Sequence, residues 1–283
     1  MGKRHVLITG GAGRVASTLR QHWGARYRLR LADVRPVVDL DRHEEYVELD
    51  ITDLGSFTVA CEGIDTILHL AADPSPQADF YQSLLSLNII GGYNGFEAAR
   101  RAGCRRLVFA SSINAVLGYG QDRQPASWEV PIYPRNVYGA TKCCWGEALA
   151  RVYGHEHALS CICVRLHSPT FDQSNFAEDA TDGGISPRDA ANLFAACIDA
   201  DEEGGFDIIH GASRHKDNWS WSVRRIHAWP TSHKTARRSP GRNAGHILAP
   251  VRCQKSELYR VPPDNRKNNT VCPCKWIYRP SAE

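Results

Sequence analysis

The 283-residue chain lacks an apolar run long enough to cross a bilayer, which takes about 20 consecutive apolar residues. Its first residues, MGKRH, pass directly into the strand-like VLITG, so we expect no secretory signal peptide. Val6 stands where N-myristoylation needs Ser or Thr. No internal repeat recurs at solenoid spacing. These absences argue against a membrane partner and a repeat protein, and we expect a cytoplasmic location.

The chain has ten cysteines, but their placement argues against a disulfide scaffold. Disulfide-dense proteins are short and secreted, whereas these cysteines are scattered through a large chain. Cys143 and Cys144 are adjacent on an expected helix, and Cys161 and Cys163 share one face of an expected strand. We therefore expect reduced thiols.

Acidic residues are scarce after Ser222. Of the 34 basic and 31 acidic residues, 13 and 3 fall in 223–283, which leaves 21 and 28 in 1–222. The basic segment is rich in Arg, Pro and Asn and shows no long amphipathic window. We expect a domain over 1–222 and a tail over 223–283 that is disordered or that results from a shift of the coding frame.

A targeting arm or a nucleic-acid-binding arm is the alternative interpretation of this tail, but basic tails are often merely solvated, and we expect no nucleic-acid partner. The metal ligands that the tail offers do not have a familiar zinc spacing, so we expect no metal. These are His246, Cys253, Cys272 and Cys274.

Up to Ser222 the chain alternates between β-rich runs and amphipathic stretches. The strand candidates are HVLITG, YRLRLAD, EEYVELD, DTILHLAA, RRLVFASS, LSCICVRL and FDIIHGAS. The helix candidates are Arg14–Trp23, Phe80–Ala102, Tyr138–Tyr153 and Pro187–Ala200, the last with Ser186 as its N-cap. Such alternation predicts an α/β fold, a parallel sheet with helices on both faces.

The stretch LITGGAGRVA places Gly10, Gly13 and Ala16 at the spacing of a dinucleotide-binding fingerprint. A strand precedes the glycines and a helix follows, so a pyrophosphate can approach the free N–H groups of the helix N-terminus. Asp33 ends the next strand about 20 residues later, where a carboxylate binds ribose hydroxyls. An ordinary tight turn does not explain Asp33, and the pattern predicts a Rossmann doubly wound domain.

The choice of cofactor follows from the same carboxylate. Asp33 repels a 2′-phosphate, which favours NAD over NADP, and Arg35 partly offsets this repulsion. Asp50 and Ile51, at the end of the third strand candidate, are placed to flank the adenine. For Asp50, a helix or turn cap is an equally good interpretation.

The stretch YGATK puts the phenol of Tyr138 and the ammonium of Lys142 four residues apart on one helix face. A tyrosine removes a proton from a hydroxyl only when its pKa is lowered, and a nearby cation lowers it. Such a pair also occurs by chance on protein surfaces. Here it follows a strand that ends in Ser111 and Ser112, downstream of the glycine loop.

Together these motifs resemble the extended short-chain dehydrogenases/reductases, the family of the NAD-dependent sugar-nucleotide epimerases and dehydratases. The matching stretches are TGGAGRVA, LAD at 31–33, DI at 50–51, HLAA at 69–72, LNIIGGYN, FASS at 109–112 and YGATK. Their order and spacing both agree with the family over about 1–222. The resemblance implies that Tyr138 is the general base, that Lys142 holds the nicotinamide ribose and lowers the tyrosine pKa, and that Ser112 polarises the reacting oxygen.

The resemblance also implies a set of cofactor contacts, with Asn88 supporting the active-site helix. The residues concerned are Gly10, Gly13, Arg14, Val15, Asp33, Asp50, Ile51, Leu70, Ala71, Ala72, Asn88, Tyr138 and Lys142.

One departure from the epimerase pattern narrows the choice within the family. Epimerases typically use the third residue of the Ser-Ser-x stretch, which is Ile113 here, whereas the uronate and aldose C1 dehydrogenases are similar in using the second, Ser112. By that resemblance Ser75, Asn114 and Ser168 contact a sugar. A loop cap, a turn residue and a strand-end polar group are the respective alternatives.

A second departure concerns the substrate. Uronate dehydrogenases hold the sugar carboxylate with an arginine beyond the strand that ends near Leu166, and this chain has no Arg or Lys between Leu166 and Pro187. This absence favours a neutral aldose over a uronate as the substrate, unless Arg165 or Arg188 reaches the carboxylate. We expect an NAD-dependent sugar dehydrogenase that forms a lactone. Two alternatives remain: a sugar-nucleotide epimerase or dehydratase, and a non-catalytic NAD-binding protein. The sequence leaves open whether the protein forms a homo-oligomer.

Overall fold

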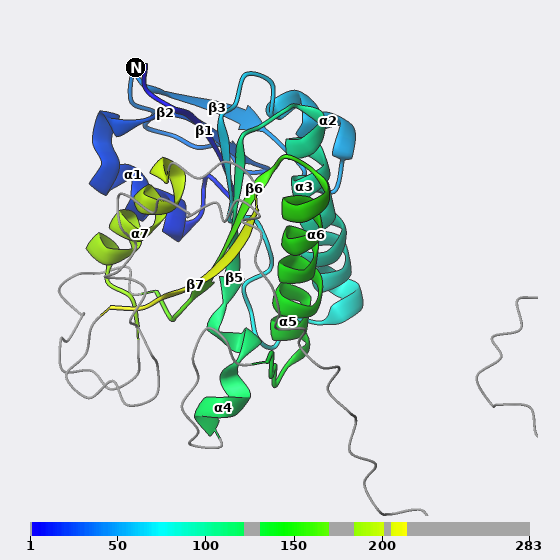
Figure 1. The fold of residues 1–283 in the computed structure, drawn as a ribbon. Helices are drawn as coiled ribbons and strands as arrows, with labels where there is room; N and C mark the ends of the chain where they lie inside the picture. Colours follow the sequence, from blue (N-terminus) through cyan, green and yellow to red (C-terminus); the bar gives the residue numbers. More distant parts are fainter. Residues whose placement is uncertain (1, 122–130, 170–183, 201–204, 214–283) are drawn as a thin grey trace, which may run out of the picture. The chain divides into compact units, whose positions relative to one another are not determined.

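The computed structural model describes residues 2–121, 131–169, 184–200 and 205–213 (Figure 1). All described residues fall within one compact unit. The boundary near Ser222, the basic tail and its possible metal ligands lie outside these residues and stay predictions. Among the helices that are described, none is long and apolar enough to cross a membrane.

The described strands form one seven-stranded parallel sheet in the order β3-β2-β1-β4-β5-β6-β7. The strands are β1 (His5–Thr9), β2 (Arg28–Asp33), β3 (Glu44–Glu48), β4 (Thr66–His69), β5 (Arg106–Ser112), β6 (Ser160–Leu166) and β7 (Phe206–Gly211). All seven strand candidates are confirmed. The strand order reverses between β1 and β4, and ligands of such sheets bind at the carboxyl ends of the strands beside this point.

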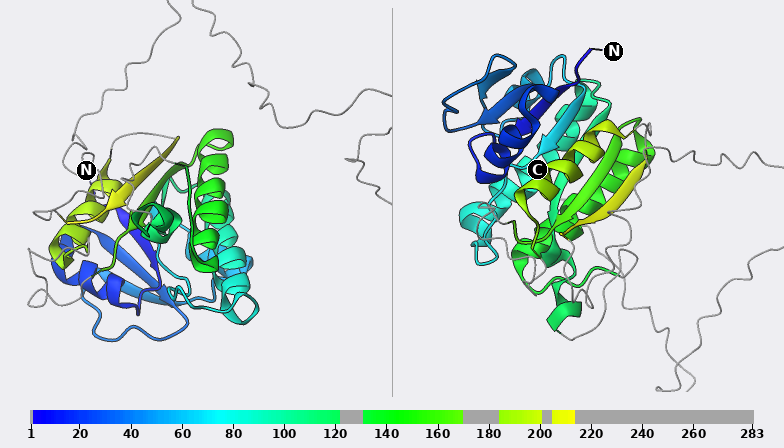
Figure 2. Two further views of the ribbon diagram at one scale, coloured as in Figure 1. Left: turned by 90° about the horizontal axis from the view of Figure 1, so that it is seen from below. Right: turned by 90° about the vertical axis from the view of Figure 1, so that its left-hand side faces the viewer.

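Helices cover both faces of the sheet, as the alternation predicts (Figures 1 and 2). On one face lie α1 (Arg14–Trp23) and α7 (Pro187–Asp199), and the Trp23 indole N–H donates to the Ala191 carbonyl across 2.8 Å. On the other face lie α2 (Leu54–Ala60), α3 (Gly91–Arg101) and α6 (Ala148–Glu156). Each face has its own buried apolar cluster, since successive residues of β1 point to opposite sides.

Sequence signals within a few residues predict where α1 and α7 begin. The bounds of α1 are as expected, and Ser186 caps α7 by accepting from the Asp189 amide N–H at 3.2 Å. Sequence reasoning missed α2, a seven-residue helix whose N-cap Asp53 accepts from the Gly55 and Ser56 amides. Its Asp cap was a readable signal, but the helix is too short to show a clear periodicity.

The two helices nearest the site are not regular along their length. The expected helix over Phe80–Ala102 begins as a π-helix, η2 (Phe80–Ile90), and continues as α3. The expected helix over Tyr138–Tyr153 begins with α5 (Val137–Ala140), passes through the π-helix η4 (Thr141–Glu147) and continues as α6. π-Helical turns are rare in proteins overall, but those that occur are often found at functional sites. Two short helices follow β5 at the carboxyl end of the sheet, η3 (Ile113–Ala115) and α4 (Leu117–Gln121). A third, η1 (Gly24–Arg26), joins α1 to β2 at the opposite end.

The seven described cysteines are all free thiols, as expected. Cys161 and Cys163 both belong to the apolar cluster that α3 and α6 cover. The Sγ atoms of Cys143 and Cys144 lie 3.8 Å apart without a bond, and burial raises the pKa of the Cys143 thiol to about 12.

Candidate active site

The glycine loop closes tightly over the start of α1. Gly10 has φ +72°, a region that favours glycine, and a Cβ there would lie 3.1 Å from the Ala71 nitrogen. A Cβ on Gly13 would lie 2.9 Å from the Gly10 carbonyl oxygen. Gly13 is also the N-cap of α1 and gives it no side-chain cap. The helix N-terminus therefore suits an anion such as a pyrophosphate.

Asp33 is built into this loop. Its Oδ2 accepts from the Ala12 amide at 3.0 Å and its Oδ1 from the Arg35 amide at 3.0 Å. A carboxylate has about four lone-pair sites, so two remain for ribose hydroxyls. The Arg35 side chain is 69% exposed and its Nε lies 3.7 Å from Asp33 Oδ1. The residues present fit a dinucleotide with a free 2′-hydroxyl.

We expect Asp33→Ala to weaken NAD binding about 10- to 100-fold, because hydrogen bonds to a charged acceptor contribute about 1.5–3 kcal/mol. NADP binding falls less, since the substitution also removes the repulsion of the 2′-phosphate. Fluorescence titration of both nucleotides measures the difference, with exposed Asp41→Ala as the matched control. Equal losses for NAD and NADP would contradict the ribose contact.

Asp50 and Ile51 have structural tasks. Asp50 Oδ1 accepts from the Thr52 amide at 2.9 Å and from its hydroxyl at 2.8 Å, which is the turn-cap alternative. Ile51 is buried, and its carbonyl accepts from Asn94 Nδ2 at 2.9 Å. Contact of either residue with adenine stays a prediction.

The loop after β4 carries the other expected cofactor contacts. Leu70, Ala71 and Ala72 are half-buried. The Ala71 amide donates to Thr9 Oγ1 at 3.1 Å, which joins this loop to the end of β1 beside the glycine loop. Their contact with the cofactor stays a prediction.

Tyr138 and Ser112 meet at the carboxyl end of β5. Both are buried, and the Ser112 side chain is close enough to the phenol to lower its pKa, against the larger effect of burial. Ser112 Oγ also accepts from the Asn114 backbone N–H at 3.2 Å and from Asn114 Nδ2 at 3.1 Å. A hydroxyl has two acceptor sites and one proton, so Ser112 keeps that proton to donate to another group in the site. Asn114 thus joins the site, although its contact in this structure is with Ser112.

Ser75 and Ser168 show the alternative roles. Ser75 Oγ accepts from the Gln77 amide at 3.2 Å, which is a loop cap. Ser168 is exposed just beyond β6, and its carbonyl accepts from the Ile185 amide at 3.1 Å. Their contact with a sugar stays a prediction.

Lys142 is buried beside the site, with 4% of its surface exposed. Its Nζ lies 4.8 Å from the centre of the Phe109 ring, and burial lowers its pKa to about 8. The resemblance implies that Lys142 lowers the Tyr138 pKa, whereas in the structure other groups act on the Tyr138 phenol. The pKa of Tyr138 is raised, because burial and the Asp73 carboxylate raise it while the Ser112 hydroxyl lowers it. The Lys142 ammonium lies over the Phe109 ring of β5. The effect of Lys142 on Tyr138 stays a prediction.

Asn88 joins two parts of the site. Its Oδ1 accepts from the Asp73 amide at 2.9 Å, and its Nδ2 donates to the Thr141 hydroxyl at 3.1 Å. That hydroxyl donates in turn to the Tyr138 carbonyl at 2.7 Å. The loop after β4 is thereby fixed to the helix that carries Tyr138, as the resemblance implies.

Sequence reasoning missed Asn136, which orients both sides of the site. Its Oδ1 caps α5 by accepting from the Gly139 amide at 2.6 Å, and its Nδ2 donates to Asn114 Oδ1 at 2.7 Å. An Asn two residues before YGATK is a typical N-cap, so the signal was present.

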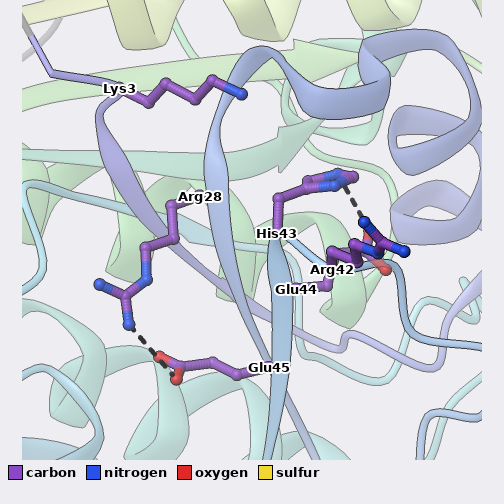
Figure 3. A pocket seen from close by; sticks show the side chains of 6 residues that line it. All are labelled: Lys3, Arg28, Arg42, His43, Glu44 and Glu45. Atoms are coloured by element: carbon purple, nitrogen blue, oxygen red, sulfur yellow. Dashed lines mark ion pairs between the residues drawn. The ribbon is translucent and has the colours of Figure 1, made fainter.

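A pocket at the opposite edge of the sheet has a different character (Figure 3). It has a volume of about 440 Å³ and is lined by Lys3, Arg28, Arg42, His43, Glu44 and Glu45. Asp41, His43 and Glu44 offer ligand atoms within 4.8 Å of one another. Glu44 is already neutralised by Arg20 at 2.6 Å, so this group is an ion-pair network in the structure.

Comparisons with known proteins agree with this geometry. The model of the NAD dependent epimerase/dehydratase family matches residues 6–179. The NAD-dependent glucose-6-phosphate dehydrogenase of Haloferax volcanii is 35% identical and covers 79% of this chain and 90% of its own length. The uronate dehydrogenase of Agrobacterium fabrum is 32% identical, with 81% of both chains covered. A mutant uronate dehydrogenase of Agrobacterium tumefaciens, solved with NAD, superimposes with a TM-score of 0.69 at 31% identity, covering 80% of this chain and 83% of that one.

The fingerprint, the Rossmann sheet and these matches concern the same part of the chain. The protein therefore belongs to the NAD-dependent epimerase/dehydratase family, among the extended short-chain dehydrogenases/reductases and near their uronate dehydrogenases.

Proposed function

We propose that this protein is an NAD-dependent dehydrogenase that oxidises a cyclic sugar at C1 to the lactone. The buried pair of Tyr138 and Ser112, in which the serine hydroxyl lowers the pKa of the phenol, carries the proposal. Both lie at the carboxyl edge of the sheet, the edge to which the glycine loop also belongs. The dehydrogenases similar to this chain support it.

The chemistry follows from the groups of this chain. NAD, when bound, supplies the acceptor for the hydride of C1, so the sugar loses two electrons and two hydrogens overall. Tyr138, as phenolate, accepts the proton of the C1 hydroxyl. Ser112 donates a hydrogen bond to the same oxygen while the carbonyl bond of the lactone forms. Lys142 and Asp33 hold the two riboses, and the start of α1 holds the pyrophosphate.

The substrate specificity follows from where the cations lie. The Arg165 side chain is 2% exposed and ion-paired with Glu147. The Arg188 side chain is 67% exposed and lies 3.3 Å from Asp189. Neither is placed to grip a sugar carboxylate, and the stretch between Leu166 and Pro187 has no Arg or Lys.

We expect kcat/KM for a neutral aldose such as arabinose, xylose or galactose to exceed that for glucuronate by about tenfold, because neither Arg165 nor Arg188 is placed to give the carboxylate a charged partner, which contributes about 1.5–3 kcal/mol. A panel of free sugars with NAD, followed at the nicotinamide absorbance, measures it. A clear preference for uronates would show that another cation reaches the carboxylate.

The same panel separates the alternatives. Turnover of a UDP-sugar without net reduction of NAD would establish the epimerase instead. Tight NAD binding without turnover of any sugar would establish the non-catalytic protein. The Tyr138 and Ser112 pair predicts neither result.

A further inference from the structure

A buried ion pair joins the helix that follows Tyr138 to the strands beneath it. Glu147, the last residue of η4, accepts at Oε1 from Arg165 Nε at 2.9 Å and at Oε2 from Arg165 Nη2 at 2.8 Å. Oε1 also accepts from the Ser111 hydroxyl at 2.6 Å. Only 4% of the Glu147 side chain is exposed. A buried ion pair of this kind contributes little net stability, so its presence calls for another reason.

The π-helical winding decides which residues share the inner side of this helix. In an α-helix, residues three and four apart lie on one face, whereas a π-helix bonds residues five apart. Lys142 and Glu147 are five apart, and both are buried toward the sheet. Lys142 lies over Phe109 of β5, and Glu147 binds Ser111 and Arg165.

The two partners of Glu147, Ser111 and Arg165, lie beside Ser112. Ser111 directly precedes Ser112 on β5, and it pairs in register with Arg165 on β6. One carboxylate therefore contacts the strand that presents Ser112, the neighbouring strand, and the helix segment that presents Lys142.

We propose that Glu147 is a positioning residue: with Ser111 and Arg165 it fixes the segment that carries Lys142 against the strand that carries Ser112. The inference rests on the proposed function for its catalytic consequence. Other contacts hold the same segment against η2, namely the Trp145 indole N–H, which donates to the Ile89 carbonyl at 2.9 Å, and the bond from Asn88 to Thr141.

Two variants test this role. Ser111→Ala keeps the ion pair and removes one contact, so it folds even where Glu147→Gln is poorly stable. We expect kcat to fall about tenfold in Ser111→Ala and further in Glu147→Gln, because small displacements of reacting groups cost up to about 100-fold. KM for the sugar stays within about threefold, whereas Kd for NAD rises a few-fold, since the displaced segment carries Lys142.

Glu97→Gln is the matched control. Glu97 is also buried and accepts from Arg100, Arg101 and the Tyr153 hydroxyl, but it touches neither Ser112 nor Lys142. Its kcat should equal that of the wild type. If Ser111→Ala and the control have the same kcat, the positioning role is wrong.

Hydrogen exchange of the amides in 141–147 gives a measurement that needs no sugar. We expect faster exchange there in Ser111→Ala and Glu147→Gln, and unchanged exchange in Glu97→Gln. Unchanged exchange in Ser111→Ala overturns the inference. A wild-type protein that oxidises no sugar overturns the proposed function alone, since the exchange rates decide this inference by themselves.

Discussion

Tyr138→Phe should lower kcat about 10²- to 10⁴-fold, the usual contribution of a positioned acid or base. The phenyl ring keeps the packing of α5, while the proton acceptor is lost. NAD affinity should stay within a few-fold, because the ring of Tyr138, the pyrophosphate site and Lys142 all remain. Steady-state kinetics with the preferred sugar and titration with NAD measure the two effects.

Tyr153→Phe is the control for this variant. Tyr153 is buried on the continuing helix α6, and its hydroxyl donates to Glu97 Oε2 at 3.0 Å, away from Ser112. Its turnover should match the wild type. Turnover of Tyr138→Phe close to that of Tyr153→Phe would remove Tyr138 from the mechanism.

Lys142→Met should make the protein more stable and much less active. The Lys142 pKa is about 8 in the folded chain and 10.5 ordinarily, so burial disfavours the ammonium by about 3 kcal/mol. The contact with the Phe109 ring, lost in the variant, offsets about 1–2 kcal/mol. At pH 7 we expect a gain of about 1–3 kcal/mol, seen as a Tm higher by several degrees.

The pH dependence of this gain follows from the sign of the shift. Below pH 8 the folded protein holds the ammonium and bears its full burial cost. Between pH 8 and 10.5 the unfolded chain binds more protons than the folded one, so wild-type stability rises with pH and the advantage of Lys142→Met shrinks. Exposed Lys3→Met is the control and should leave Tm unchanged. A Lys142→Met protein that is less stable than wild type at pH 7 would falsify this account.

The same substitution should lower kcat/KM at least about tenfold, since it removes charged hydrogen-bond donors from the nicotinamide ribose. The loss should appear in NAD affinity as well as in kcat, unlike that of Tyr138→Phe. Wild-type activity in Lys142→Met would show that the lysine is a buried structural residue only.

The sequence by itself determined the seven strands, the bounds of α1 and the start of α7, because these depend on periodicity and on caps within a few residues. It also placed Gly10, Gly13 and Asp33 at one loop and Tyr138 and Lys142 on one helix. Each of these inferences concerns residues that are close in the chain, or residues at a spacing that is typical of the dinucleotide-binding fold.

Only the tertiary structure decided how the site is held together. Asn136 meets Asn114 from 22 residues away, Asn88 meets Thr141 from 53, and Arg165 meets Glu147 from 18. The π-helical winding and the pKa of Tyr138 likewise depend on what packs around them. Burial and contacts of this kind arise when strands and helices from distant parts of the chain are stacked together, and no local pattern of residues records that stacking.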